Sequence, residues 1–350
     1  MRVLADNFQP KPCEQGCFWP PVETDLEPKK TEASIVWSFS VNRLFRKCQR
    51  QWFYKTKVAN ALAKKDPVRR EAYILSKLGS IHSWRGRLVD QVIEKSIIPS
   101  FQMRRQPRLA TVLEEARARF DRQLRFGLEH RLRDPGFKAK EHEDDLAAFF
   151  GMEYGNPPIE SEIQQARQEV ETALTNLIES PRFEEIRTSL MAASQMTAQC
   201  TIMFPHAGAT VRAVPDLICF FPQEPPIIID WKVHHFGVHD YYAQLVCYAL
   251  ALTRCGPHGL LPPALKAYPA HAVRLIEAQL LTAEARHHTI SEDDVLNVED
   301  KMAADINEML LAVDDRENSE LTADDFPKAH HMGVCDTCNF RKLCWRNNYE

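Results

Sequence analysis

The 350-residue sequence lacks the features that would place it in a membrane or outside the cell. It has no apolar run long enough to cross a bilayer, and its first residues, MRVLADNFQP, lack the apolar core of a secretory signal peptide. Without such a signal, ten cysteines argue against a disulfide scaffold and indicate thiols in a reducing compartment. We therefore expect a cytoplasmic protein.

Other absences limit the activities that the chain can carry. It contains no G-x-x-x-x-G-K-[ST] segment, so it encodes no helicase or ATPase motor, and any motor it works with is another polypeptide. It also shows no internal repeat and no low-complexity tract. With 44% hydrophobic residues, the sequence can build one large core that carries a helical insertion.

A net charge of −4 does not by itself suggest a nucleic-acid-binding protein, but the charges are unevenly distributed. Residues 41–70 carry ten Lys or Arg against one acid and include the aromatic run Trp52, Phe53 and Tyr54. Phosphate attraction and base stacking would use such a segment, although a solvated helix face gives the same pattern. The predicted nucleic-acid contacts are Arg43, Arg46, Lys47, Arg50 and Tyr241.

The periodicity of the sequence predicts an α/β fold with a mixed central sheet flanked by helices. Helices are expected over residues 38–64, 71–97, 106–190, 240–254 and 291–313, the last with Ser291 and Asp294 as a capping box. Strands are expected over residues 196–204, 210–221 and 226–233 and in the segment VRLIEAQLLTA. The corresponding domains are an N-terminal arm (1–33), N-terminal helices (34–97), a helical subdomain (98–195), a catalytic core (196–313) and a C-terminal cysteine segment (314–350).

Two acids and a lysine follow neighbouring strands of the predicted sheet. Ile227, Ile228 and Ile229 indicate a buried strand, and alternation along it points Asp230 and Lys232 to one face and Trp231 to the other. Asp216 follows the strand VRAV, and the segment FPQEPP forms the turn between the two. If these strands pair, both carboxylates can reach one ion.

Hard oxygen ligands suit Mg²⁺ or Mn²⁺, and Lys232 beside them can orient or deprotonate a water and offset charge on a phosphate. Such a group is suited to cutting a phosphodiester. In the alternative interpretation, Asp216 ends a turn, Asp230 caps a strand, and Lys232 pairs with one of them. The following helix favours a site, because Gln244 and Tyr248 lie four residues apart and share one of its faces.

This arrangement resembles the PD-(D/E)XK nuclease superfamily, with Pro215-Asp216 as the first acid and Asp230-Trp231-Lys232 as the second acid and lysine. The segment Q-L-x-x-Y-A resembles the Q-x-x-x-Y motif of the RecB-like branch. The resemblance implies a restriction-endonuclease-like core that hydrolyses DNA, with a preference for single strands or ends. The residues it implies are metal ligands at Asp216, Asp230 and the Trp231 carbonyl, Lys232 as the water-assisting group, and Gln244 and Tyr248 as backbone contacts.

The RecB-like branch also implies a histidine ligand on an upstream helix. His82, in the segment LGSIHSWRGRLVD, is the candidate, and an imidazole ligand favours Mn²⁺ over Mg²⁺. The family often has a Glu on the strand before the first acid, where this chain offers Gln199 or Gln195. This departure predicts weaker metal binding, and it leaves open a non-catalytic DNA-binding or assembly subunit.

The C-terminal segment contains Cys335, Cys338 and Cys344, and Cys48 is the best candidate for a fourth ligand. Thiolates at this spacing suit zinc or an iron–sulfur cluster. The alternatives are ordinary thiols, as we expect for the apolar positions Cys200, Cys219, Cys247 and Cys255, and rival ligands at Cys13 and Cys17 or at His330 and His331.

The four cysteines are similar to a subgroup of RecB-like nucleases that holds a [4Fe-4S] cluster, which would join the N- and C-terminal segments. That subgroup includes CRISPR-associated adaptation exonucleases and the nuclease domains of AddB-type repair proteins. The resemblance implies roles in repair, CRISPR adaptation or anti-phage defence, with DNA and a separate helicase or defence protein as partners. His234, His235 and His239 are expected in a loop beside the site.

Overall fold

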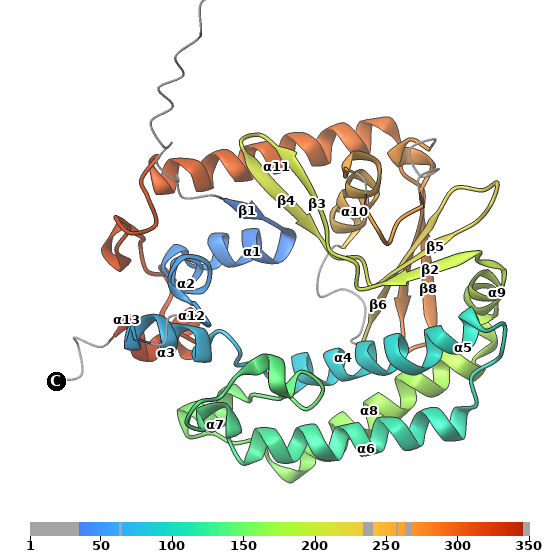
Figure 1. Ribbon diagram of the computed structural model, residues 1–350, viewed down its shortest axis with the longest axis horizontal. Helices are drawn as coiled ribbons and strands as arrows, with labels where there is room; N and C mark the ends of the chain where they lie inside the picture. The colour runs from blue at the N-terminus through green and yellow to red at the C-terminus, as the bar shows by residue number, and fades with distance from the viewer. Residues whose placement is uncertain (1–34, 63–64, 234–240, 257, 263–267, 346–350) are drawn as a thin grey trace, which may run out of the picture. The chain divides into compact units, whose positions relative to one another are not determined.

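The strands form two sheets in the part of the chain that the structure describes (Figure 1). The computed structural model describes residues 35–62, 65–233, 241–256, 258–262 and 268–345. The larger sheet has the strand order β2 (Gln195–Ala198), β5 (Leu217–Phe220), β6 (Ile227–Lys232), β7 (Arg274–Gln279) and β8 (Glu284–His288). The smaller sheet has the order β1 (Val36–Trp37), β4 (Ala209–Ala213) and β3 (Ile202–His206). The predicted arm and Cys13, Cys17, His234, His235 and His239 lie outside the described residues.

The larger sheet is mixed, because β6 pairs antiparallel with β5 and parallel with β7. Helices flank it, and the predicted fold class is confirmed. Helices α4 (Ile81–Val92), α6 (Leu109–Leu128) and α8 (Glu160–Glu179) lie on one side, and α10 (Tyr242–Arg254) and α11 (Glu292–Val313) lie on the other (Figure 1). The shorter helices are α1 (Phe39–Lys47), α2 (Gln49–Phe53), α3 (Pro67–Leu75), α5 (Ile98–Gln102), α7 (Phe150–Tyr154), α9 (Glu184–Ala192), α12 (Met332–Asp336) and α13 (Arg341–Cys344).

Two of the predicted strands are each divided in the structure. The predicted strand 196–204 breaks at Gln199, whose φ of 48° lies in the left-handed region, so its halves become β2 and β3 in different sheets. The predicted strand 210–221 breaks at Pro215 and Asp216, and its halves are β4 and β5. These breaks place β3 and β4 in the smaller sheet and β2 and β5 in the larger, central one. Strand β8 was not predicted.

The predicted helix 38–64 also contains a break, at Cys48, where the chain becomes extended with φ of −167°. The Cys48 sulfur then accepts a hydrogen bond from the Gln51 N–H and caps α2, which continues into a π-helical turn, η1 (Tyr54–Val58). The capping box predicted for α11 is confirmed, because Ser291 and Asp294 bond reciprocally. Among the described residues, no helix is long and apolar enough to cross a membrane.

Alternating side chains of β6 enter two hydrophobic cores. Ile227, Ile229 and Trp231 pack with residues of α4, α6 and α8, whereas Ile228 packs with residues of α10 and α11. This confirms the predicted alternation, which turns Trp231 away from the face that carries Asp230 and Lys232. The site acids therefore leave the sheet on the side of α10.

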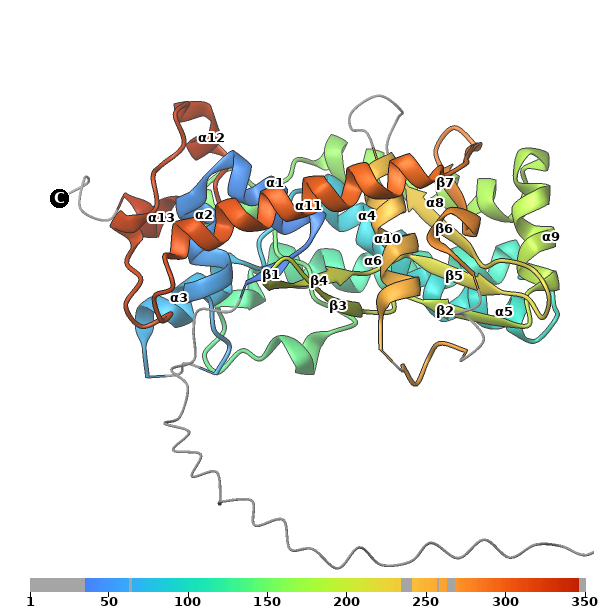
Figure 2. The ribbon, with the colours of Figure 1, turned by 90° about the horizontal axis from the view of Figure 1, so that it is seen from above.

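The two ends of the described chain meet beside α11. In both ribbon views, α1 and α2 lie next to α12 and α13 (Figure 2). Phe53 of α2 stacks on Phe326 with ring centroids 4.8 Å apart, and Tyr54 stacks on Phe340 at 5.8 Å. Aromatic packing thus joins segments separated by nearly three hundred residues.

Candidate active site

The register between β5 and β6 brings the first two predicted acids together. Leu217 pairs with Ile229 across the antiparallel strands, which places Asp216 opposite Asp230. The Trp231 N–H donates to Asp216 Oδ2 at 2.9 Å, so the first acid is tied to the strand that carries the second. Asp230 is 1% exposed. Two buried carboxylates held this close repel each other unless a proton or a cation lies between them.

Lys232 supplies one such cation. Its ammonium forms an ion pair with Asp230 and lies 4.3 Å from the centroid of the Tyr241 ring. Burial by itself would lower the pKa of Lys232, but the attraction of Asp230 and Asp216 outweighs it and raises the pKa. Lys232 is therefore charged at neutral pH and shared between the two acids.

A third acid, Asp90 of α4, lies in the same electrostatic environment. Burial raises the pKa of Asp90 to about 7, and the negative charge of Asp230 adds to the effect while Lys232 opposes it. The pKa of Asp216 is raised well above its usual range, first by burial and then by the charges of Asp230 and Asp90. The three carboxylates therefore behave as one group around one lysine.

His82, the histidine predicted as a ligand, stands elsewhere on α4. It is exposed in the first turn of the helix, eight residues or about 12 Å before Asp90. Asp90, by contrast, interacts electrostatically with Asp216, Asp230 and Lys232. The structure thus adds Asp90 to the two acids that the sequence predicts.

A sequence signal for Asp90 does exist. Asp90 interrupts an apolar stretch of α4 formed by Leu88, Val89 and Val92, all of which are fully buried. A carboxylate on such a buried stretch is unfavourable unless it has a partner or a function.

Gln244 and Tyr248 share a face of α10, as predicted, and the Gln244 side-chain N–H donates to the Tyr248 hydroxyl at 2.5 Å. Burial raises the pKa of Tyr248, and the charges of Asp230 and Asp216 raise it further. Tyr248 therefore keeps its proton and can donate to an anion near the acids.

Gln199 occupies the position next to the first acid. Its side-chain N–H donates to Asp216 Oδ1 at 3.0 Å, whereas Gln195 donates to the Leu260 carbonyl. Of the two glutamines considered at the family's Glu position, only Gln199 reaches the site. On the other side of β6, Glu277 of β7 is aligned with Asp230 and is 4% exposed, and the sequence analysis missed it.

The sequence profile of the PD-(D/E)XK nuclease superfamily matches residues 36–345, which is most of the chain. The protein belongs to the PD-(D/E)XK nuclease superfamily. No curated protein matches the sequence. Among solved structures, it is similar to a candidate exonuclease from Eubacterium rectale with 12% identity and a TM-score of 0.31 over 75% of this chain and 91% of that one. That likeness is too weak to support an argument.

Membership confirms the resemblance to the PD-(D/E)XK superfamily that the motifs indicate. Members of this superfamily typically use Mg²⁺ or Mn²⁺. The donors fit such an ion, because burial and the negative charge of Asp230 raise the pKa of Asp90 and of Asp216, and a dication would relieve that repulsion. Among the described residues, no three His, Cys, Asp or Glu side chains already stand at coordination spacing. Lys232 contacts the Asp230 carboxylate and would have to move aside for an ion.

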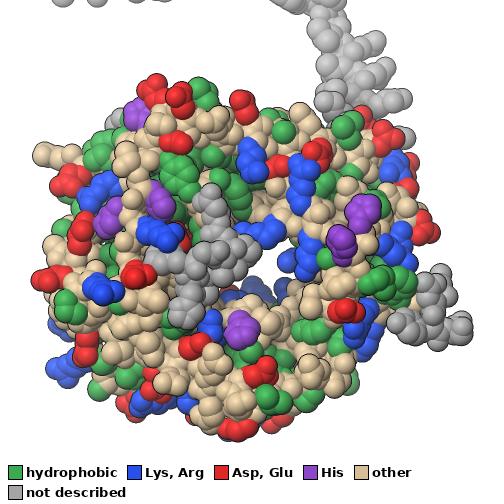
Figure 3. Space-filling model, turned by 180° about the vertical axis from the view of Figure 1, so that it is seen from behind, with side chains coloured by type: hydrophobic (Ala, Val, Ile, Leu, Met, Phe, Trp, Pro, Cys, Tyr) green, Lys and Arg blue, Asp and Glu red, His purple; other side chains and the backbone are tan. Residues whose placement is uncertain are grey.

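Cations line the approach to this nuclease site. Burial lowers the pKa of Arg87 and that of Lys77, and the positive charges of Arg87 and Lys55 lower the pKa of Lys77 further. Arg87 and Lys55 nevertheless have exposed side chains. A lowered pKa together with an exposed side chain is expected where a charged group lies in a depression of the surface. Figure 3 shows Lys and Arg side chains around a hollow on one face of the molecule.

The predicted nucleic-acid contacts divide into two groups. Arg43 is exposed and acts electrostatically on Tyr241, so it lies at the site, and Lys47 is exposed on the same helix. Arg46 instead pairs with Asp305 and Glu308 of α11, and Arg50 donates to the Phe326 carbonyl and pairs with Asp324. Both arginines thus pair with residues of α11 or of the segment that follows it.

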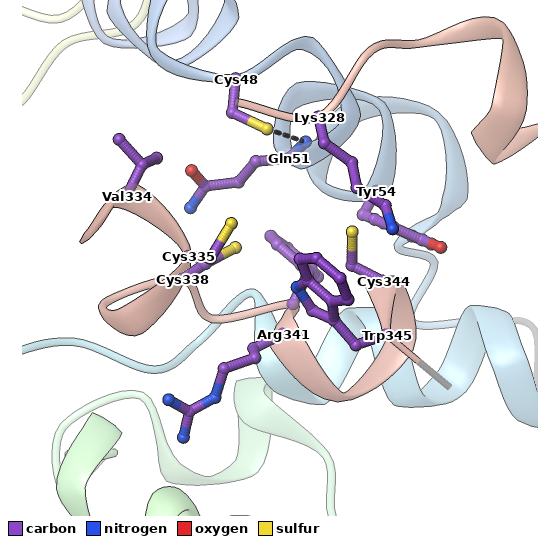
Figure 4. Close-up of a pocket in the computed structure, with 11 residues that line it drawn as sticks. Cys48, Gln51, Tyr54, Lys328, Val334, Cys335, Cys338, Arg341, Cys344 and Trp345 are labelled. Carbon is purple, nitrogen blue, oxygen red and sulfur yellow. Dashed lines mark hydrogen bonds between the residues drawn. The ribbon is translucent and has the colours of Figure 1, made fainter. Parts of the chain in front are cut away.

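The four predicted cysteine ligands line one pocket. The sulfurs of Cys48, Cys335, Cys338 and Cys344 face a common space between α2, α12 and α13 (Figure 4). Burial raises the pKa of Cys338 to about 12, and the charges of Cys48, Cys344 and Cys335 add to the rise. Arg50 and Lys328 lower the pKa of the Cys344 thiol and partly offset its burial.

The other thiols behave as small apolar side chains. Cys200, Cys219, Cys247 and Cys255 are buried, and burial raises the pKa of Cys219 and of Cys247 to about 12. His330 and His331 are exposed, and neither is among the residues that line the four-cysteine pocket.

Proposed function

We propose that this protein is a metal-dependent deoxyribonuclease that hydrolyses phosphodiester bonds at the group formed by Asp90, Asp216, Asp230 and Lys232. One observation carries the proposal: three acids from α4, the start of β5 and β6 share one buried environment with a lysine. Structural pairs rarely concentrate three carboxylates on one cation, because the third charge has no partner.

Mg²⁺ or Mn²⁺ bound there would lower the pKa of a water and polarise the scissile phosphate. Asp90, Asp216, Asp230 and the Trp231 carbonyl would hold the ion, an arrangement of oxygen donors in which no histidine is needed. Lys232, released from Asp230, would orient the water and stabilise negative charge on the phosphate. Tyr248, held by Gln244, would donate a hydrogen bond to the DNA backbone.

The substrate we propose is single-stranded DNA or a DNA end. Lys77 interacts electrostatically with Lys55 and Arg87, and Arg87 interacts with Asp90, so these cations could bind the phosphates of a flexible strand near the acids. Repair, CRISPR adaptation and anti-phage defence all use such a nuclease, with a separate helicase or defence protein as partner. The genes beside this one would distinguish these pathways.

The test is cleavage of end-labelled single-stranded and duplex DNA with Mn²⁺, Mg²⁺ or excess chelator. Wild type should cleave only with metal, and Lys232→Ala and Asp230→Asn should each lose about 100-fold or more in rate. Lys301→Ala, which removes an exposed lysine of α11, is the control and should match wild type. Equal rates for wild type and Lys232→Ala would exclude this site as the source of activity.

A second candidate function is DNA binding or assembly without cleavage. The hydrogen bonds of Asp216 favour this function. Its two carboxylate oxygens already accept hydrogen bonds from the Gln199 side chain and from the Trp231 N–H. In that case the protein would bind DNA in chelator, and added Mn²⁺ would produce no products. A gain of cleavage in Gln199→Glu would then identify the missing acid as the cause.

We also propose that Cys48, Cys335, Cys338 and Cys344 hold a [4Fe-4S] cluster. The observation in its favour is that four thiols from both ends of the chain face one pocket next to Arg50 and Lys328, whose charges would stabilise thiolates. Protein purified without oxygen should be brown and contain iron and sulfide. Colourless protein with one zinc per chain would contradict the cluster in favour of a zinc site.

A further inference from the structure

A second cavity lies apart from both the carboxylates and the cysteines. It has a volume of about 540 Å³ and lies between residues 61–62 and α3 on one side and residues 136–140 on the other. Leu62, Arg70, Tyr73, Phe137, Lys138 and Lys140 lie on its wall. Its size is within the range of small-molecule and nucleotide sites. We call it the distal pocket.

The lining of the distal pocket is cationic. Arg70, Lys138 and Lys140 lie on its wall, and no Asp or Glu does among the described residues that form it. Arg70 donates a hydrogen bond to the Phe137 carbonyl. Because a carbonyl carries no net charge, this bond does not neutralise the guanidinium. Lys138 pairs with Glu141 at the exposed rim, where such a pair contributes little and can be exchanged for an anion.

The distal pocket also has a flat apolar surface beside its charges. Tyr73 is half-buried, and Arg70 and Lys77 lie over its ring, 5.3 and 4.9 Å from the centroid. Leu62 is 86% exposed, which is unusual for a large apolar side chain unless something covers it. An aromatic ring that contacts cations can stack a nucleobase while those cations bind its phosphates.

A line of positive charge connects the distal pocket with the carboxylates. Arg70 and Tyr73 lie one turn apart on α3, and Lys77, just beyond the end of this helix, also contacts the Tyr73 ring. Lys77 interacts electrostatically with Arg87 and Lys55. Arg87 in turn interacts with Asp90. A polyanion lying on these residues would run from the distal pocket to the site of cleavage.

We propose that the distal pocket binds a nucleotide of single-stranded DNA away from the bond that is cut, with Tyr73 and Leu62 against the base and Arg70, Lys138 and Lys140 against phosphates. The proposal rests on the proposed nuclease function. It assigns to this pocket the affinity for long substrates, and it leaves the chemistry to the carboxylates and Lys232.

Binding is tested in chelator, so that no cleavage is needed, by fluorescence anisotropy with labelled oligothymidylate of about 20 nucleotides. Lys138→Ala/Lys140→Ala should weaken binding about tenfold and reduce the slope of log affinity against log salt by about 1.4, the value for two phosphate contacts. The control is Arg105→Ala/Lys301→Ala, which removes two exposed cations elsewhere. Equal slopes for the two double variants would overturn the proposal.

Stacking is tested at Tyr73. Tyr73→Ala should weaken binding of the same oligonucleotide at least about fivefold, whereas Tyr73→Phe, which keeps the ring, should stay within about twofold of wild type. Equal losses in both variants would contradict stacking. Tighter binding of oligouridylate of the same length by wild type would overturn the assignment to DNA.

Cleavage separates the distal pocket from the proposed function. With substrates of about 20 nucleotides, Lys138→Ala/Lys140→Ala should raise KM and leave kcat unchanged, and with substrates of about 6 nucleotides it should change neither. A lowered kcat would place these lysines in the chemistry and overturn the proposal. If wild type does not cleave at all, the nuclease function fails, and the anisotropy experiments still decide the pocket.

Discussion

At the scale of single residues, Asp90 is the main addition that the structure makes to the candidate site. The sequence motifs identify Asp216, Asp230 and Lys232, whose spacing along two strands determines that they meet. They do not identify Asp90, because its partners lie more than a hundred residues away and only the packing of α4 against the end of β6 brings them together. The sequence predicts His82 as a ligand because the RecB-like branch that the motifs resemble has a histidine on an upstream helix.

Substitutions at Asp90 and at His82 should therefore have different effects on the rate of cleavage. Asp90→Asn should lower Mn²⁺-dependent cleavage about 10–100-fold or more, since it removes a charge from the ion site and keeps the shape of the side chain. His82→Ala should stay within about twofold of wild type. Initial rates over a range of Mn²⁺ concentrations measure both, and the opposite ranking of the two variants would restore His82 as the ligand.

The raised pKa of Asp90 also predicts how stability depends on pH in the metal-free protein. Between the ordinary value of 3.8 and the folded value of about 7, the folded state binds a proton that the unfolded state releases. Stability must then fall as pH rises through this window. Asp90→Asn removes that loss, so its unfolding temperature in chelator should exceed that of wild type at pH 8 but not at pH 4. A constant difference between the two proteins across this range would contradict the shift.

At the scale of elements, the sequence predicts which segments are helical or extended better than where they end. The alternation of Ile227 to Lys232 correctly predicts β6 and the faces of its side chains, because one strand buried on both sides leaves a clear pattern. The division of β2 from β3 depends on a left-handed Gln199, which no local propensity favours. The break at Cys48 follows from the position of its sulfur at the four-cysteine pocket, a tertiary constraint.

The contacts between α1 and α11 show that the role of a surface charge also depends on tertiary packing that the sequence does not reveal. A basic helix predicts nucleic-acid contacts, but Arg46 pairs with Asp305, a residue 4% exposed that also accepts a hydrogen bond from Asn42 at 2.6 Å. Arg43, one turn earlier, is exposed and acts electrostatically on Tyr241 instead. The roles of these two arginines can be assigned only when the partner helix is known.

These contacts predict that substituting Arg43 affects DNA binding, whereas substituting Arg46 affects stability. Arg43→Ala should weaken binding of single-stranded DNA severalfold and leave the unfolding temperature unchanged, because Arg43 is exposed at the site. Arg46→Ala should leave DNA binding unchanged and lower stability by about 1 kcal/mol, because Asp305 keeps only Asn42. Anisotropy and thermal denaturation measure the two effects, and reversed effects would assign the DNA contact to Arg46.

At the scale of the whole molecule, the two ends of the described chain contact each other beside the nuclease core. Stacking of Phe53 on Phe326 and of Tyr54 on Phe340 provides contacts that need no cofactor. The four thiols lie next to this aromatic packing, so a cluster would strengthen a contact that already exists. Tyr54 also connects the two features, because its hydroxyl donates to the Leu343 carbonyl beside Cys344.

Loss of the proposed cluster should therefore loosen the C-terminal segment without unfolding the core. Protein treated with an iron chelator, or Cys335→Ser, should unfold at a lower temperature and be cleaved by protease first after Leu321, while the sheet stays protected. Mass spectrometry of the early fragments measures this. Identical fragments and rates with and without the treatment would show that the thiols hold nothing that matters to the fold.

The central claim is that one dication binds between the carboxylates at the junction of α4, β5 and β6. The most direct measurement is a crystal structure of protein soaked in Mn²⁺, with the ion located by its anomalous scattering. The account predicts an ion bonded to Asp216 and Asp230, with Asp90 bound directly or through a water and Lys232 turned away from Asp230. An ion absent from these carboxylates, or held by His82 instead, would contradict it.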